Sequence, residues 1–150
     1  MKRIHLSGLQ GFAREVLESI SPRSDGAAFV VALSGDLGAG KTTFMQALAR
    51  ELDIIEPVQS PTYVLMRSYP ISSRGFRKLV HIDAYRLESA AEFKTLHPDL
   101  FLNDPSALVC VEWPERIGEM LPKPDILITL RPVQGDPDVR DVEIEMSSVQ

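Results

Sequence analysis

The chain has 150 residues, of which 44% are hydrophobic and 25% are charged, and its formal net charge is −5. These values are ordinary for one globular domain, and no apolar run approaches the ~20 residues of a membrane-spanning helix, so we expect a single domain over residues 1–150 and no association with a membrane. The acidic balance argues against a basic face that grips nucleic acid by its phosphates, so any nucleic-acid role is expected to run through a partner.

The first half of the chain predicts a helix, a buried strand, a glycine-rich loop and a second helix. No apolar stretch follows the two positive charges near the N-terminus, so we expect no signal peptide. Ser7 is a candidate N-cap for a helix whose apolar residues recur at helical spacing over 9–20 and which ends by Pro22. The unbroken apolar run 27–33 is typical of a buried strand, and a helical apolar stripe follows the loop over 43–52.

The second half predicts further strands, a short helix and a closing hairpin near the sheet edge. The expected strands are 63–69, 78–83, 107–111, 125–130 and 139–146, with turns at 70–77 and 135–138 and a helix at 89–96. Cys110 is the single cysteine and lies in an apolar run, so we interpret it as a core residue and expect a reducing, cytoplasmic location.

The loop after the first predicted strand carries the strongest functional signal. It fits the pattern G-x-x-x-x-G-K-[ST], in which backbone N–H groups surround a nucleoside triphosphate, Lys41 bridges the β- and γ-phosphates and Thr42 ligates Mg²⁺. Strand, loop and helix N-terminus are the parts that such an anion site requires. We therefore predict an α/β fold, a single P-loop NTPase-like domain with a mixed β-sheet flanked by helices. The expected nucleotide-binding residues here are Gly35, Asp36, Leu37, Gly38, Ala39, Gly40, Lys41, Thr42 and Thr43.

Two carboxylates are predicted to complete this site. Glu112 directly follows the apolar run 107–111, and a carboxylate at the end of a buried strand beside the P-loop can hold Mg²⁺, hold one of its waters or orient the attacking water. Asp83 ends a second apolar run, where alternation sends His81 and Asp83 to one face. The alternatives are a solvent-exposed carboxylate for Glu112 and a turn or cap residue for Asp83.

Two further features have both a functional and a structural interpretation. The segment Ser60-Pro61-Thr62 fits a switch region whose hydroxyl senses the γ-phosphate and Mg²⁺, or an ordinary proline turn. Trp113 follows Glu112, and its ring can stack near a nucleotide or a partner, or be a half-buried tryptophan.

Four blocks of the sequence together resemble the TsaE family, also called YjeE. They are Gly35–Phe44 (GDLGAGKTTF), Ser60–Tyr63 (SPTY), His81–Arg86 (HIDAYR) and Val111–Pro114 (VEWP). Their order and spacing match the family, and the resemblance covers nearly the whole chain. The chain differs from the family's usual pattern at Ala84 and at Leu96-His97-Pro98-Asp99, and its C-terminal hairpin is generic.

The resemblance implies a small bacterial, Mg²⁺-dependent ATPase required for threonylcarbamoyladenosine (t6A) at tRNA position 37. It implies that the protein binds the TsaB–TsaD heterodimer, which would hold the tRNA, and that ATP hydrolysis resets that complex between turnovers. By the same resemblance, Lys41 and the loop amides hold ATP phosphates and Thr42 ligates Mg²⁺. Glu112 is the other Mg²⁺-associated acid, Asp83 is an acid important for activity, and Trp113 and Glu115 form the rim of the nucleotide pocket.

Two other functions share the P-loop. A small-molecule or nucleoside kinase is expected to carry an arginine-rich lid, but the lid-sized stretch 93–104 contains no arginine. A GTP-dependent switch is expected to carry an N-K-x-D segment for guanine, and the chain has none. An ATPase is therefore the leading interpretation, and the kinase is the main alternative.

Overall fold

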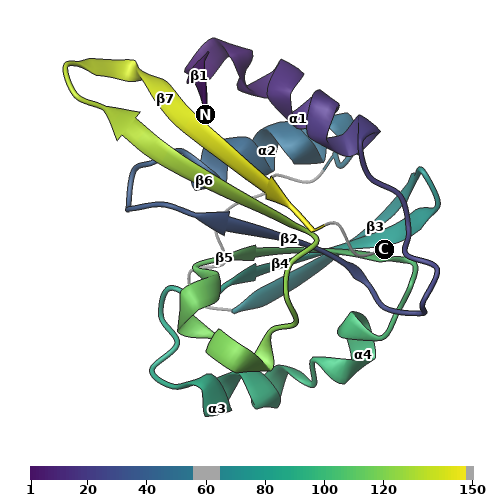
Figure 1. Ribbon diagram of the computed structural model, residues 1–150. Coiled ribbons are helices and arrows are strands. Elements are labelled where there is room, and N and C mark those ends of the chain that lie inside the picture. Colours follow the sequence, from purple (N-terminus) through teal and green to yellow (C-terminus); the bar gives the residue numbers. More distant parts are fainter. Residues whose placement is uncertain (56–64, 148–150) are drawn as a thin grey trace.

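The computed structural model describes residues 1–55 and 65–147 and shows a seven-stranded mixed sheet with helices on both faces (Figure 1). The strand order is β1-β7-β6-β2-β5-β4-β3. The strands are β1 (Lys2–His5), β2 (Phe29–Ser34), β3 (Met66–Ser73), β4 (Phe76–Asp83), β5 (Ala107–Glu112), β6 (Ile126–Val133) and β7 (Asp136–Met146). The α-helices are α1 (Leu9–Glu18), α2 (Lys41–Glu51), α3 (Ala90–Phe93) and α4 (Asp99–Leu102), and short 3₁₀ turns cover Leu6–Gly8, Lys94–Leu96, Pro114–Arg116 and Gly118–Met120. The predicted α/β fold with a mixed sheet is confirmed.

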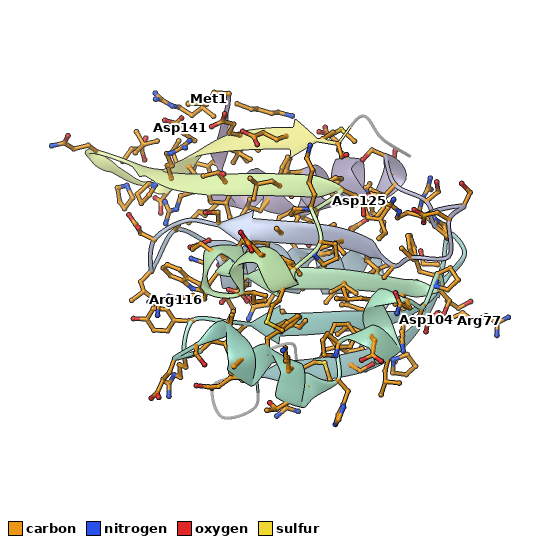
Figure 2. The ribbon with its side chains drawn as sticks, turned by 60° about the horizontal axis from the view of Figure 1, so that its bottom comes forward. Met1, Arg77, Asp104, Arg116, Asp125 and Asp141 are labelled. Carbon is orange, nitrogen blue, oxygen red and sulfur yellow. The ribbon has the colours of Figure 1, made fainter. Side chains whose placement is uncertain are left out.

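The central strands run parallel, and this brings their carboxyl ends to one edge of the molecule. β2 pairs in parallel with β5 and β6, and β4 pairs in parallel with β5, whereas β1, β3 and β7 pair antiparallel with their neighbours. Figure 2 shows the two ends of β5: Arg116, just after the strand, and Asp104, just before it, lie on opposite sides of the molecule. Loops at the carboxyl ends of parallel strands are the usual place for a ligand site.

Each face of the sheet packs its own apolar cluster. The helices α1 and α2 cover one face, where Phe12 and Phe44 pack with their ring centroids 5.6 Å apart, and α3 and α4 cover the other (Figure 1). Cys110 is fully buried on the α1/α2 face, and burial raises the pKa of its thiol to about 12, so its interpretation as a core residue is confirmed.

The N-terminal prediction missed a strand. Residues Lys2–His5 form β1, which pairs with β7, and the helix begins only at Leu9 after a 3₁₀ turn. Ser7 is not the N-cap of α1: its backbone N–H donates to Nδ1 of His5 at 3.1 Å, so the histidine ring caps the preceding turn instead. A strand of four residues leaves too short a pattern for sequence periodicity to detect.

The middle of the chain corrects two predicted boundaries. The expected turn at 70–77 is wrong, because β3 continues to Ser73 and only Arg74-Gly75, both with positive φ, turn the chain into β4. Pro70 lies on β3, an edge strand, which is the usual position for a proline within a sheet. The expected helix at 89–96 is α3 followed by a 3₁₀ turn, ended by His97 in the left-handed conformation.

The predicted C-terminal hairpin is present but lies deeper in the sheet than expected. β6 pairs directly with the central β2, and β1 covers the outer side of β7. The turn is also shorter than predicted, since β7 already begins at Asp136. Among the described residues, no helix is long and apolar enough to cross a membrane.

Candidate active site

The glycine-rich loop connects the carboxyl end of β2 to the first residue of α2, and its shape depends on glycine. Gly35 has φ of 144°, and a Cβ there would lie 2.4 Å from the backbone oxygen of Leu130 on β6. Gly40 precedes α2 with φ of 105°, a conformation that residues with a Cβ rarely adopt. The loop therefore places the N-terminus of α2 at the site, and the first N–H groups of a helix attract an anion.

Lys41 is an almost buried cation whose described hydrogen bonds go to its own loop. Lys41 lines the cavity, although only 5% of the residue is exposed. Its ammonium donates to the backbone oxygens of Gly35 and Asp36, the latter at 3.1 Å. Burial lowers the pKa of Lys41, and the nearby carboxylates of Glu112 and Asp83 oppose this shift. A buried ammonium bonded to neutral carbonyls is suited to an incoming anion such as a phosphate.

The two predicted carboxylates lie side by side at the ends of neighbouring strands. In the parallel β4–β5 ladder, Asp83 is the register partner of Glu112. Both line one cavity of about 370 Å³ together with Lys41 and Thr42. The alternative that Glu112 is a solvent-exposed carboxylate is wrong, because the residue is buried. Asp83 also accepts a hydrogen bond from the backbone N–H of Tyr85 at 3.0 Å. It is therefore both a turn-capping residue and a residue of the cavity.

His81 holds Glu112 in place. Its Nε2 lies 2.6 Å from Oε2 of Glu112, and both side chains are buried. Among the described residues, none is a hydrogen-bond partner of the other ring nitrogen, Nδ1. The strand alternation placed His81 and Asp83 on one face, but it gave no sign that the imidazole would contact the carboxylate of the next strand. The register of β4 on β5 creates this contact.

Aromatic rings line the cavity beside the lysine. Trp113 leaves β5 in the left-handed conformation, and the Lys41 ammonium lies 4.2 Å from the centroid of its ring. The Tyr85 ring packs against Trp113 at 5.0 Å, and the Arg116 guanidinium lies over Tyr85 at 5.5 Å. Stacked rings of this kind suit a flat heteroaromatic group and also hold a cation by cation–π attraction.

The structure brings most of the predicted residues to one cavity. Those that line it are Leu37, Gly38, Gly40, Lys41, Thr42, Thr43, Asp83, Glu112 and Trp113. Gly35, Asp36 and Ala39 do not line it but shape the loop through their backbone oxygens. Glu115 lines a separate hollow near Pro114 and reaches the site only as a nearby charge on Lys41. The segment Ser60-Pro61-Thr62 lies outside the described residues.

Sequence reasoning missed several residues of the cavity. Leu6, Leu65, Tyr85, Arg86 and Arg140 also line it. Tyr85 and Arg86 belong to the HIDAYR block and could have been found there, but nothing in the sequence marks Arg140. Its side chain reaches the loop from β7, about 100 residues further along the chain.

Comparisons with known proteins identify the family of the chain. The profile of the family described as "Threonylcarbamoyl adenosine biosynthesis protein TsaE" matches residues 6–141. This chain belongs to the TsaE family. It is 39% identical over 121 residues to the tRNA threonylcarbamoyladenosine biosynthesis protein TsaE of a Nostoc strain, a match that spans 79% of this chain and 70% of that protein. It is 41% identical over 98 residues to the TsaE of Mycobacterium tuberculosis, spanning 61% of this chain and 57% of that protein.

A solved TsaE-like structure supports the fold. The crystal structure of Bacillus subtilis YdiB superposes with a TM-score of 0.68 and 26% sequence identity, over 97% of this chain and 83% of that chain. The resemblance drawn from the four sequence blocks is thereby confirmed at the level of the family. TsaE proteins take part in the biosynthesis of threonylcarbamoyladenosine in tRNA, and this chain carries that family's domain.

Proposed function

We propose that this protein is a Mg²⁺-dependent ATPase that acts on the TsaB–TsaD complex during t6A synthesis in the cytoplasm. One observation carries the proposal: the buried ammonium of Lys41, the N-terminus of α2 and the carboxylates of Asp83 and Glu112 converge on one cavity. A cation and helix N–H groups bind phosphates, and adjacent carboxylates bind a metal or a water. The family model names threonylcarbamoyladenosine biosynthesis, and this is the pathway to which we assign the proposed hydrolysis.

The loop would hold the phosphates of ATP. Lys41 would exchange its bonds to the Gly35 and Asp36 oxygens for bonds to phosphate oxygens, which are charged and therefore stronger acceptors. Trp113 and Tyr85 offer a stacked aromatic surface beside that position, suited to the adenine or the ribose.

The oxygen donors of the cavity also fit Mg²⁺. This ion takes oxygen ligands, is commonly held by one or two carboxylates plus substrate phosphates, and keeps several waters. Thr42 and Glu112 would hold it, and it would neutralise negative charge on the phosphates. Among the described residues no three His, Cys, Asp or Glu side chains group as a metal cage, which fits an ion shared with the substrate.

Two carboxylates are candidates for the group that orients the attacking water. Asp83 is held by the Tyr85 backbone and Glu112 by the His81 ring, so each carboxylate has a fixed orientation. A magnesium titration separates their roles. A variant whose hydrolysis recovers at high Mg²⁺ has lost a metal ligand, and one that does not recover has lost the group that orients water.

The deciding experiment measures ATP hydrolysis with and without the TsaB–TsaD heterodimer. We expect weak hydrolysis by the protein alone and a clear rise when the heterodimer is added. Lys41→Ala should abolish both rates, because it removes the cation that contacts the phosphates. The emission of Trp113, the single tryptophan, should change on ATP binding in the wild type and not in Lys41→Ala. Equal turnover with and without the heterodimer contradicts the proposal.

A further inference from the structure

Arg140 contributes a buried positive charge beside the loop. Only 9% of the residue is exposed, although arginine is rarely buried without a carboxylate partner. Within the described part of the chain, its guanidinium donates to four backbone oxygens: Ala39 at 2.9 Å, Gly38 at 3.2 Å, Pro137 at 2.7 Å and Val139 at 2.9 Å. Two of these belong to its own strand, β7, and two to the glycine-rich loop. The side chain therefore links the hairpin to the loop.

We propose that Arg140 is a positioning residue that fixes the loop backbone in the form that binds phosphate, an inference that rests on the proposed function. In a trans peptide, the C=O of one residue and the N–H of the next point in opposite directions. The oxygens of Gly38 and Ala39 are turned toward Arg140, so the N–H groups of Ala39 and Gly40 are turned away from it. The Ala39 N–H donates to the oxygen of Asp36 at 3.0 Å and closes the turn of the loop.

The hairpin also supports the other end of the loop. The oxygen of Leu130 on β6 comes so close to Gly35 that no Cβ fits between them. At Gly40 the nearest atom to a built Cβ is Nε of Arg140, at 3.8 Å. The β6–β7 hairpin thus contacts the loop at its first and last glycine, and Arg140 is the charged part of that support.

The charge and shape of the guanidinium both matter. Nε and one terminal nitrogen reach two successive loop oxygens, while the other terminal nitrogen anchors the group to β7. A lysine ammonium is a point charge on a flexible stem and does not offer this planar set of donors. Because Arg140 also lines the cavity, its charge adds to the positive potential that attracts phosphates.

The test compares Arg140→Gln with Arg131→Gln. Arg131 lies on β6, its side chain is 50% exposed and it pairs with Glu143, so this control removes the same charge without touching the loop. Hydrogen exchange of the amides over 36–42 is measured without nucleotide, and the dissociation constants of ADP and ATP are measured by calorimetry. In Arg140→Gln we expect faster loop exchange and about 10-fold to 100-fold weaker nucleotide binding, the effect of losing charge-assisted bonds that hold the loop.

Kinetics separate positioning from a general loss of structure. In the ATPase assay we expect KM to rise in Arg140→Gln while kcat stays within about threefold of the wild type, because the carboxylates are untouched. Arg140→Lys, which keeps the buried charge, serves if Arg140→Gln does not fold, and we expect loop exchange and binding intermediate between Arg140→Gln and the wild type. Wild-type loop exchange and nucleotide affinity in either Arg140 variant overturn the inference. If the wild type binds no ATP, the proposed function fails, but the exchange experiment still decides the role of Arg140.

Discussion

Two buried carboxylates lie at opposite ends of the central strands and are used differently. Asp125, just before β6, accepts from the Val30 backbone N–H at 2.8 Å and from the Arg23 guanidinium. Its own backbone N–H donates to the Val30 oxygen at 2.9 Å. Glu112, at the end of β5, contacts a histidine and faces the cavity that Lys41 also lines. Asp125 is satisfied within the fold, whereas Glu112 keeps access to a ligand.

The difference shows how a buried charge can be recognised as functional. The Arg23–Asp125 pair ties the loop before β2 to the starts of β2 and β6, and its charges are matched within the protein. At the other end, a lysine and two carboxylates surround an open cavity, and the lysine is hydrogen-bonded to neutral oxygens. Charged side chains of both signs that line one cavity indicate a site that binds a charged substrate.

Removing Asp125 should produce the largest change in stability. Asp125→Ala leaves the partly buried Arg23 without this partner and the Val30 N–H unpaired, so we expect the free energy of unfolding to fall by about 3–5 kcal/mol. Hydrolysis per folded molecule should stay within about twofold, since Asp125 does not line the cavity that contains Lys41 and Glu112. Urea denaturation measures the first and an ATPase assay the second. The exposed Asp138→Ala is the matched control, and an equal loss of stability in both variants would remove the contrast.

Glu112→Gln should produce the converse result. We expect ATP hydrolysis to fall by about 100-fold to 1,000-fold, because the amide cannot supply the negative charge that a metal or attacking water requires. Stability should change by less than about 1 kcal/mol, since the amide oxygen can still accept a bond from His81. A wild-type rate in the presence of TsaB–TsaD would show that Glu112 is a structural residue like Asp125.

His81→Leu tests whether the histidine acts through Glu112. Without the imidazole the carboxylate is free to move, and we expect hydrolysis to fall by about 10-fold to 100-fold, the usual effect of a small misplacement. The double variant His81→Leu/Glu112→Gln should be no slower than Glu112→Gln alone, because the histidine has nothing left to position. Rates that multiply in the double variant would mean that the two residues act independently.

The smallest expected effect is a pH dependence near Asp125. The Arg23 guanidinium lowers the pKa of the Asp25 carboxyl from 3.8 to about 2. Because the folded-state pKa lies below the unfolded one, this contact stabilises the fold above a pH of about 4 and loses its contribution as the pH falls toward 2. Asp25→Asn should flatten part of the acid-induced decrease of the urea midpoint. An unchanged pH profile in Asp25→Asn would contradict this.

The sequence predicts features that depend on local patterns, but it does not predict contacts that depend on the register between distant strands. The loop at Gly35–Thr42 was predictable because strand, glycines and helix follow one another within a few residues. The contact of His81 with Glu112 and that of Arg140 with Ala39 depend on which strands become neighbours and in which register. The pairing of β1 with β7 is of the same kind, and no spacing in one sequence encodes it.

Because β7 supports the loop, the site can be completed only after β7 has been synthesised. Arg140 and Ala39 are separated by 101 positions, and the register partner of Arg140 on β1 is Ile4. The loop leaves the ribosome long before β7, the strand that supports it. β1 is also synthesised long before β7, its pairing partner. Under the proposed function, tight ATP binding is therefore expected only after the hairpin has docked, and an unfinished chain is expected to bind ATP weakly.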